Sequence, residues 1–298
     1  MSSAFDRYEE ASRCAERFLV DHNITSLPVD PIAIAKNLGI EVHANPAKSA
    51  GASGMLIRVG QAYAIAYATH IESPGFRRFS ISHELGHYLL PGHPEAVLDE
   101  NGIHESFAGF RSDNVYEKEA DSFAAGLLMP SRLFSAALAN TEPGLEAIED
   151  LSSLCITSLP ATAIRYVQFA DYPVAVVVST GQSIDFCPMS DAFKALRDIE
   201  WLKKGQPVPR SSHTHTFNQS KKRVLESDRT EGVSSLHTWF GAGPEWDLIE
   251  EVLGLGKYGK TLTVLRPIIP EDSQKDEEEQ EFERDLVESW TPRFRKSR

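Results

Sequence analysis

Hydrophobic and polar positions alternate with two different periods in the first third of the chain. Apolar side chains recur every three or four residues over 5–20, which predicts an amphipathic helix. Asp30-Pro31 and Gly39 bound a second short helical pattern over 30–38. The runs 54–59 and 61–69, separated by Gly60, are short and β-rich, and they predict a hairpin.

Helical spacing returns after the predicted hairpin. It extends from Phe76 to Leu90, where Pro91-Gly92 ends it. Residues 91–114 have no clear period, so no element is predicted there. Residues 116–129 form another strong helical pattern that ends at Pro130, and two further helical segments are expected at 131–140 and 145–168.

A second domain is expected to begin near residue 171. Residues 174–179 and 183–186 predict two strands, 190–203 and 246–253 are expected to be helical, and 261–266 predict a closing strand. The pattern indicates an α+β protein. The expected division is a first domain over 1–140, a helix-turn-helix-like helical segment over 141–170, an α+β domain over 171–270, and a charged, flexible tail over 271–298.

Composition narrows the classes of function. The 298 residues are 41% hydrophobic and 24% charged, which is typical of a globular protein, and no apolar run reaches the ~18 residues that a membrane span needs. The N-terminus lacks the apolar core of a signal peptide, so a cytoplasmic protein is expected. The three cysteines form no CxxC pair, and the net charge of −13 does not favour nucleic acid.

The sequence His83-Glu84-Leu85-Gly86-His87 lies inside the helix predicted over 76–90. Two imidazoles four residues apart share one helix face, where both can bind a single cation, and the glutamate lies close enough to hold a metal-bound water. The chain therefore has the pattern of a zinc peptidase. The pentamer needs a third ligand to be specific.

The helix predicted over 116–129 offers that ligand. Glu119 begins a face that continues with Phe123 and Leu127, and a carboxylate on an apolar face is unfavourable unless it is paired or binds metal. Glu119 is therefore the expected third ligand. Glu117 is a competing candidate, and Asp121 is a weaker one.

At these two motifs the chain resembles the ImmA/IrrE metallopeptidases. The matching segments are RRFSISHELGHYLL at 77–90 and EKEADSFAAGLLMP at 117–130, preceded by SGMLI and AIAYA, and the resemblance covers about residues 5–169. It implies a mainly helical, zincin-like domain with a small β-sheet. It also implies His83, His87 and Glu119 as zinc ligands and Glu84 as the general base.

The resemblance also implies a substrate. Such peptidases cut a small helix-turn-helix repressor of the XRE type and so release genes of stress response or mobile-element transfer. An extended substrate would then add to an edge strand by β-augmentation. The expected edge strand carries Ala62, Tyr63, Ile65 and Tyr67.

The chain departs from the thermolysin-like pattern at one position. Thermolysin-like enzymes have an aspartate four residues after the ligating glutamate, where it orients a histidine, but four residues after Glu119 stands Phe123. A donor for the oxyanion is also expected. Its candidates, none of them assigned, are Tyr63, Tyr67, His93 and His104.

Two other segments bear on partners. Residues 145–169 resemble the helix-turn-helix-like segment that follows such peptidases, but three acids face a single Arg165, which favours packing over direct nucleic-acid binding. The stretch 203–223 is basic, and a solvated loop is the favoured interpretation. Residues 171–270 resemble a GAF-like sensor domain by order and length.

The resulting hypothesis is a cytoplasmic zinc endopeptidase that cleaves a helix-turn-helix repressor. Zn²⁺ suits two imidazoles and a carboxylate, and Mn²⁺ is the competing ion. The alternative is a non-proteolytic, antitoxin-like module that binds the repressor and keeps the metallopeptidase fold. The retained Glu84 argues against that alternative, because a pure binder does not need its base beside the metal.

Overall fold

The structure, a computed structural model, describes residues 4–45, 52–70, 73–107 and 114–269. The chain divides into two compact units, residues 1–169 and 170–298, and each is described by itself. The tail predicted to be flexible, 271–298, lies outside the described residues. Among the described helices, none combines the length and the apolar character needed to cross a membrane.

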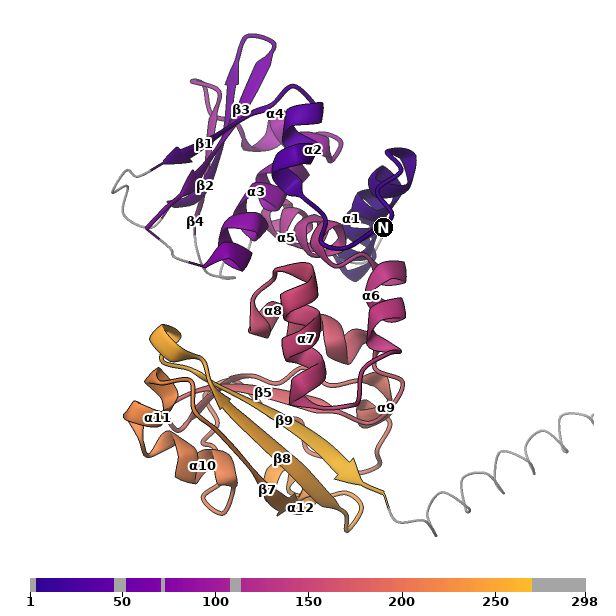
Figure 1. The fold of residues 1–298 in the computed structure, drawn as a ribbon, viewed down its shortest axis with the longest axis vertical. Helices are drawn as coiled ribbons and strands as arrows, with labels where there is room; N and C mark the ends of the chain where they lie inside the picture. Colours follow the sequence, from indigo (N-terminus) through magenta and orange to yellow (C-terminus); the bar gives the residue numbers. More distant parts are fainter. Residues whose placement is uncertain (1–3, 46–51, 71–72, 108–113, 270–298) are drawn as a thin grey trace, which may run out of the picture. The chain divides into compact units, whose positions relative to one another are not determined.

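The N-terminal unit combines helices with one small sheet (Figure 1). Its helices are α1 Ala4–Asp21, α2 Pro31–Asn37, α3 Pro74–Leu89, α4 His93–Val97, α5 Val115–Leu128, α6 Ser131–Leu138, α7 Leu145–Cys155 and α8 Leu159–Phe169. Its strands are β1 Glu41–Asn45, β2 Ala52–Val59, β3 Ala62–Ala68 and β4 Ile103–Phe107.

The sheet has the strand order β1-β3-β2-β4. Strands β2 and β3 form the predicted antiparallel hairpin, with Val59 opposite Ala62 at its turn. Strand β4 pairs antiparallel with β2 and sets His104 opposite Leu56. Both β4 and α4 lie within 91–114, where the hydrophobic pattern predicted no element, because each is only five residues long and therefore shows too few positions to establish a period.

The expectation that β3 is an edge strand is wrong. Strand β3 pairs with β1 on one side, in parallel over residues 64–68, and with β2 on the other. Ile65 and Tyr67 therefore cannot accept an added strand, whereas Ala62 and Tyr63 pair with β2 alone among the described strands. Among the described strands, the edges of this sheet are β1 and β4.

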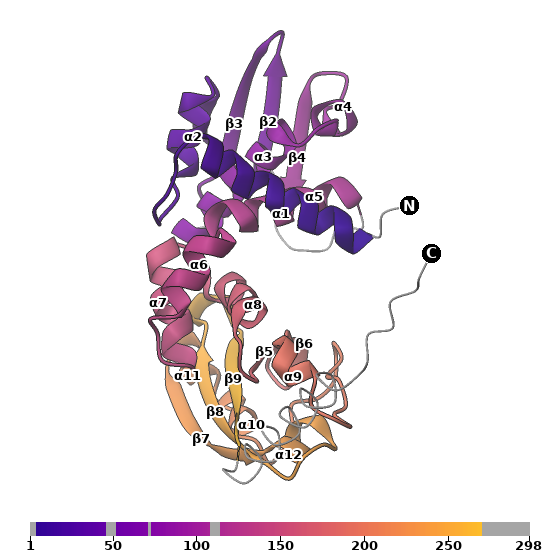
Figure 2. The ribbon, with the colours of Figure 1, turned by 90° about the vertical axis from the view of Figure 1, so that its right-hand side faces the viewer.

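Helix α3 lies between the sheet and α5, and α1 lies along α5 (Figures 1 and 2). Two glycines allow these helices to approach closely. A Cβ at Gly86 of α3 would lie 3.2 Å from the Ala120 backbone of α5, and a Cβ at Gly126 of α5 would lie 2.5 Å from the Ser12 hydroxyl of α1. The apolar faces of α3 and α5 are thus held in contact, and this contact fixes the relative position of their polar side chains.

The helical pair α7 and α8 packs within the same unit. Their buried faces are apolar, and the Tyr166 hydroxyl accepts a hydrogen bond from the Gly144 backbone. Arg165, the one basic residue of the pair, donates to the Met129 carbonyl at 2.9 Å and to Glu16 at 3.3 Å. The Arg165 guanidinium is therefore paired within the N-terminal unit.

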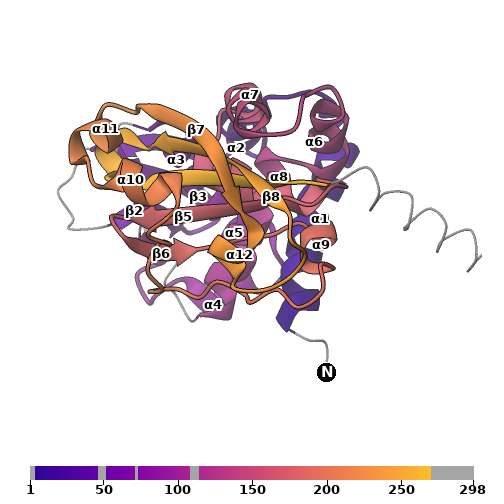
Figure 3. The same ribbon diagram turned by 90° about the horizontal axis from the view of Figure 1, so that it is seen from below.

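The C-terminal unit is an α+β structure built on a five-stranded antiparallel sheet of order β6-β5-β9-β8-β7. Helix α10 packs against β7 and β8 (Figure 3). The strands are β5 Ala175–Thr180, β6 Ser183–Phe186, β7 Arg229–Ser235, β8 Asp247–Gly254 and β9 Thr261–Ile268. The helices are α9 Asp191–Lys194, α10 His213–Asn218, α11 Lys221–Leu225, α12 Leu236–Phe240 and the short 3₁₀ helix Gly256–Tyr258.

Strands β5, β6 and β9 lie where strands were predicted, but two helical predictions in this unit are wrong. Residues 246–253 are mostly strand β8, and 190–203 contain only the single turn α9. The inward-facing positions of β8 include Glu250, whose buried carboxylate accepts from the Thr214 backbone and hydroxyl at 2.6 and 2.7 Å. An acid at a core position masks the two-residue alternation of a strand. Strand β7, with its polar and exposed residues, was not predicted.

Candidate metal centre

Four side chains from three elements converge in the N-terminal unit. His83 and His87 of α3, His104 of β4 and Glu117 of α5 each offer one ligand atom, and these atoms all lie within 4.8 Å of one another. The Nε2 atoms of His83 and His87 are 3.1 Å apart. The Glu117 carboxylate lies 3.2–3.4 Å from the Nε2 atoms of all three histidines.

The helix caps help to place these residues. Ser73 caps α3 by accepting from the Phe76 N–H, and Pro74 follows it at the first helical position. Asn114 caps α5 by accepting from the Tyr116 N–H. Glu117 therefore lies in the first turn of α5, opposite the middle of α3.

The predicted third ligand, Glu119, is not in this cluster, and the competing candidate Glu117 takes its place. Glu117 and Glu119 are two residues apart on α5, so their side chains leave the helix on nearly opposite faces. Glu119 Oε1 accepts from Arg7 Nε at 2.6 Å, and its Oε2 lies 3.0 Å from His93 Nε2. Glu119 is buried as expected, but a cation and an imidazole satisfy its carboxylate without a metal.

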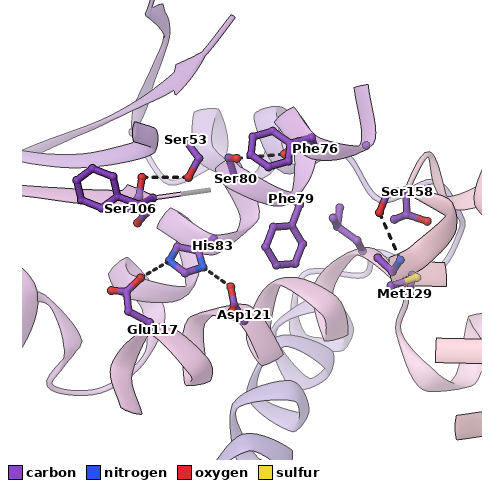
Figure 4. A pocket seen from close by; sticks show the side chains of 15 residues that line it. Ser53, Phe76, Phe79, Ser80, His83, Ser106, Glu117, Asp121, Met129 and Ser158 are labelled. Atoms are coloured by element: carbon purple, nitrogen blue, oxygen red, sulfur yellow. Dashed lines mark hydrogen bonds and ion pairs between the residues drawn. The ribbon is translucent and has the colours of Figure 1, made fainter. Parts of the chain in front are cut away.

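With Glu117 in the cluster, the aspartate expected four residues after the ligating glutamate is present. Asp121 stands four residues after Glu117, and its Oδ1 lies 2.9 Å from His83 Nδ1 (Figure 4). Ligating histidines are commonly oriented by such a carboxylate on the second ring nitrogen. Phe123 is a core residue. The spacing of Glu117 and Asp121 was visible in the sequence and would have favoured Glu117.

Glu84 lies fully buried next to His83 on α3. Neither carboxylate oxygen has a hydrogen-bond partner among the described residues. Gly54 of β2 makes room for it, since a Cβ there would lie 2.5 Å from Glu84 Oε1. Burial raises the pKa of Glu84, and the neighbouring His83 and the Ser106 hydroxyl oppose that rise. An unpartnered buried carboxylate beside four converging ligand atoms fits a site that holds a metal ion and its water.

The charges of the cluster are strongly coupled. Burial disfavours the protonated form of His83, but hydrogen bonds to Asp121 and Glu117 outweigh it and raise its pKa to about 10. Burial and the neighbouring imidazoles lower the pKa of His87 to about 3. Burial also disfavours the ionised form of Glu117, yet hydrogen bonds from His104, His83 and His87 lower its pKa well below the usual range.

Among the four candidate oxyanion donors, only His104 lies in the cluster. Its Nε2 is 3.2 Å from the Ser106 hydroxyl. Tyr63 packs edge-on against Tyr88, and Tyr67 packs against the hydrophobic core. His93 lies behind His87, in contact with that residue's other ring nitrogen.

His93 follows His87 by six residues, the spacing of the third histidine ligand in metzincins. The structure nevertheless keeps it out of the cluster.

A pocket opens beside His83 (Figure 4). Its walls come from α3, β4, α5 and the turn between α7 and α8, and they combine aromatic rings with small polar side chains. The side chain of Phe107 is 63% exposed at the end of β4. The labelled lining residues are Ser53, Phe76, Phe79, Ser80, His83, Ser106, Glu117, Asp121, Met129 and Ser158.

A helix with two histidines around a glutamate, completed by a carboxylate from a second helix, is the donor set of a metallopeptidase. Comparison with known proteins agrees. Residues 35–153 match the family described as the IrrE N-terminal-like domain, Peptidase_M78. Residues 35–153 are thus similar in sequence to the ImmA/IrrE metallopeptidases.

Two curated relatives carry the name radiation response metalloprotease IrrE. The protein from Deinococcus radiodurans is 30% identical over 104 residues, which cover 35% of this chain and 30% of that protein. The protein from Deinococcus deserti is 33% identical over 79 residues, which cover 26% and 27%. The matches thus span less than a third of each relative's length.

A solved structure described as a Mycobacterium tuberculosis transcriptional regulator has a similar fold. The TM-score is 0.53 at 15% identity, covering 87% of this chain and 76% of that chain. At this identity the likeness extends to the fold alone.

Proposed function

We propose that this protein is a zinc-dependent endopeptidase that cleaves a helix-turn-helix transcriptional repressor. The observation that carries the peptidase assignment is the buried, unpartnered carboxylate of Glu84 beside His83, His87 and Glu117. A protein that only binds a partner has no use for a desolvated base at that position. The match of residues 35–153 to a metallopeptidase family also supports metal-dependent peptide hydrolysis.

His83, His87 and Glu117 would hold the ion, and three protein ligands leave a position for water and substrate. Zn²⁺ bound there would lower the pKa of a coordinated water toward ~7 and polarise a peptide carbonyl. Glu84 accepts the proton of the attacking water on its carboxylate and then delivers it to the leaving amine nitrogen. His104 faces the same space and can donate from Nε2 to the carbonyl oxygen.

Zinc is the proposed ion because imidazole nitrogens and one carboxylate suit it. Mn²⁺ favours oxygen ligands, and the three proposed ligands are two imidazoles and one carboxylate. Metal analysis of the protein purified from its native host, without added salts, tests this choice. Manganese at one equivalent with no zinc would contradict it.

An extended substrate fits β4 better than β3. Strand β4 is an edge of the sheet among the described strands and carries His104 of the cluster and Ser106 of the pocket wall. A peptide that pairs with β4 would run past the cluster and place a side chain against Phe107. Phe107→Ala is expected to raise KM for the substrate and leave zinc binding unchanged.

The repressor as substrate and the sensor role of the C-terminal unit belong to this proposal. The antiparallel sheet of that unit places its first and last strands, β5 and β9, side by side at the centre with helices α10 and α11 packed against it. This α+β architecture is compatible with the proposed GAF-like sensor. A sensor of this kind would control access to the metal centre.

The sharpest test compares new protein N-termini in the native host that carries either the wild-type protein or Glu84→Gln. Glu84→Gln keeps the shape of the side chain and the metal ligands but removes the base. A cut found only with the wild type, within a small helix-turn-helix regulator, is the expected result. His83→Ala serves as the metal-free control.

The rival hypothesis is a binding module that sequesters the repressor without cutting it. It predicts that Glu84→Gln still relieves repression, whereas a peptidase loses that effect. Relief of repression by Glu84→Gln at wild-type level, with the repressor intact, would replace the proposal by the rival.

A further inference from the structure

Two buried polar residues of the N-terminal unit take no part in the proposed chemistry. Glu119 of α5 is 7% exposed and His93 of α4 is 3% exposed. A carboxylate and an imidazole are costly to bury, so their partners matter. Those partners form a continuous series that ends at a proposed metal ligand.

The series begins at α1 and ends at α3. Arg7 Nε donates to Glu119 Oε1 at 2.6 Å, Glu119 Oε2 lies 3.0 Å from His93 Nε2, and His93 Nδ1 lies 3.2 Å from His87 Nδ1. His87 Nε2, on the far side of that ring, faces His83 Nε2 at 3.1 Å inside the cluster. Each ring nitrogen of His93 thus has one partner.

The turn before α4 explains how His93 reaches this place. Helix α3 ends at Leu89, and Gly92 follows with φ of +77°, a backbone conformation that glycine adopts without strain. The His93 N–H bonds back to the Leu90 carbonyl at 3.2 Å. The chain therefore reverses and sets the His93 ring behind His87, where the Tyr116 ring packs against it edge-on.

The donors and acceptors in this series can be assigned in order. An ionised carboxylate only accepts, so the hydrogen between Glu119 and His93 belongs to His93 Nε2. A neutral imidazole with hydrogen on Nε2 accepts at Nδ1, so the hydrogen between the two rings belongs to His87 Nδ1. His87 then presents the lone pair of Nε2 to the cluster, which is the form that binds metal.

We propose that His93 and Glu119 are positioning residues that fix the tautomer and the ring orientation of His87 for metal binding. The inference rests on the metal centre of the proposed function, and it extends that function by a relay through two side chains. His83 has a direct carboxylate partner in Asp121. For His87, the carboxylate is that of Glu119, and the His93 ring lies between the two side chains.

The first test needs no mutation. Long-range ¹⁵N–¹H NMR of the zinc-loaded full chain, labelled at histidine, reports which ring nitrogen carries hydrogen. His87 is expected to carry hydrogen on Nδ1 with Nε2 bound to zinc, and His93 is expected to carry hydrogen on Nε2 alone. The opposite tautomer at either ring, or zinc bound to His87 Nδ1, would overturn the relay.

The second test measures zinc affinity by competition with a chromophoric chelator. His93→Phe keeps a ring but removes the acceptor, and Glu119→Gln leaves one acceptor for two donors, so both are expected to weaken zinc binding roughly 10–100-fold. His93→Gln restores an acceptor and a donor and should lose less than His93→Phe. Tyr116→Phe, which keeps the ring that packs on His93, is the matched control.

The outcomes separate this inference from the proposed function. Folded His93→Phe and Glu119→Gln proteins with wild-type zinc affinity would reduce the series to packing, whatever the peptidase activity. If His93→Phe fails to fold, Glu119→Gln and the NMR of the unmodified protein still decide the question. A protein that shows the expected tautomers but cuts no repressor would keep the relay and refute the proposed function.

Discussion

Glu84 owes its position to a missing side chain on the neighbouring strand. Gly54 of β2 faces the carboxylate so closely that a methyl group would lie 2.5 Å from Oε1. Glu84 is fully buried and has no hydrogen-bond partner among the described residues. Its orientation therefore depends on the shape of the space around it.

Gly54→Ala is expected to push the Glu84 carboxylate aside and slow peptide hydrolysis by about 10²-fold or more, since general bases contribute roughly 10²–10⁴-fold. The metal ligands are untouched, so zinc affinity should stay near the wild-type value. Steady-state kinetics with the proposed repressor substrate and a zinc titration measure the two effects. Val59→Ala, at the exposed end of the same strand, is the control, and wild-type activity of Gly54→Ala would contradict the argument.

His104 can act in two ways in this cluster, as a donor to the substrate or as a fourth ligand. A catalytic zinc site keeps three protein ligands and an open position, so we expect a donor. His104→Ala should then lower kcat by roughly 10²–10³-fold, with zinc retained and KM little changed. Loss of zinc from His104→Ala, measured by metal analysis, would instead make it a ligand.

Proton release on metal binding follows from the charges of the same residues. Hydrogen bonds to Asp121 and Glu117, acting against burial, raise the pKa of His83 to about 10, so the metal-free protein keeps this proton at pH 7. A ligating imidazole must be neutral, and the proton is released. Zinc affinity should therefore rise about tenfold per pH unit from pH 7 to 9, measured with a pH-corrected chelator. An affinity independent of pH would contradict this assignment.

The same raised pKa affects stability in the opposite sense. A folded-state pKa above the unfolded value stabilises the metal-free protein below the unfolded pKa near ~6.5, and this contribution is lost as pH rises toward 10. Both effects come from the same proton of His83: alkaline pH removes it from the metal-free fold, and zinc binding releases it.

At the scale of elements, α8 is held to α1 and α5 by one arginine. The Arg165 side chain is 11% exposed and donates to Met129, Ser131 and Glu16. Arg165→Ala is expected to destabilise the N-terminal unit by roughly 2–4 kcal/mol, because it removes the donor to the Met129 carbonyl and the cation that pairs with Glu16. Urea unfolding followed by circular dichroism measures the change, and Ser153→Ala, exposed on the neighbouring helix α7, is the control.

The engagement of Arg165 also bears on nucleic acid. A helix pair that reads DNA needs free cations for phosphate contacts, and the only basic residue of 145–169 is committed inside the unit. We expect no DNA affinity from α7 and α8. A wild-type protein whose DNA binding weakens steeply with salt, and whose Arg165→Ala variant loses that binding while still folded, would contradict this.

Long elements with a strong period were predicted and short ones were not. Helices α1, α3 and α5 and the β2–β3 hairpin fall within a few residues of their predicted bounds. Strand β4 is short and lies among turn residues, and β8 carries the buried Glu250 at a core position. Each failure has a local physical cause. Because β4 was not predicted, His104 was only one of four unassigned candidates for the oxyanion donor.

At the scale of the whole molecule, the metal centre lies within one of two compact units. All four tryptophans stand after residue 170, so tryptophan fluorescence reports the C-terminal unit, whereas the helices of both units contribute to circular dichroism. The chain thus carries separate signals for its two parts. Metal binding should affect them unequally.

Zinc at 100 times its dissociation constant is expected to stabilise the N-terminal unit by about 2.7 kcal/mol, which corresponds to roughly 5–10 °C in Tm. The tryptophan transition, dominated by buried Trp239, should not move. Thermal scans with zinc and with a chelator, followed by both signals, make the measurement. Glu117→Gln should abolish the shift, and an equal shift in both signals would contradict a metal centre confined to one unit.

The sequence by itself determined the main helices, the hairpin, and the chemistry of His83, Glu84 and His87, because helical spacing alone places two imidazoles on one face. It left the choice between Glu117 and Glu119 to be decided by burial, and burial favoured Glu119, which lies outside the cluster. Only tertiary structure could decide that choice, since it depends on which face of α5 meets α3 and on Arg7 and His93, which arrive from α1 and α4 to satisfy Glu119. The same holds for His104, which the pairing of β4 with β2 brings to the cluster, and for β3, which β1 covers.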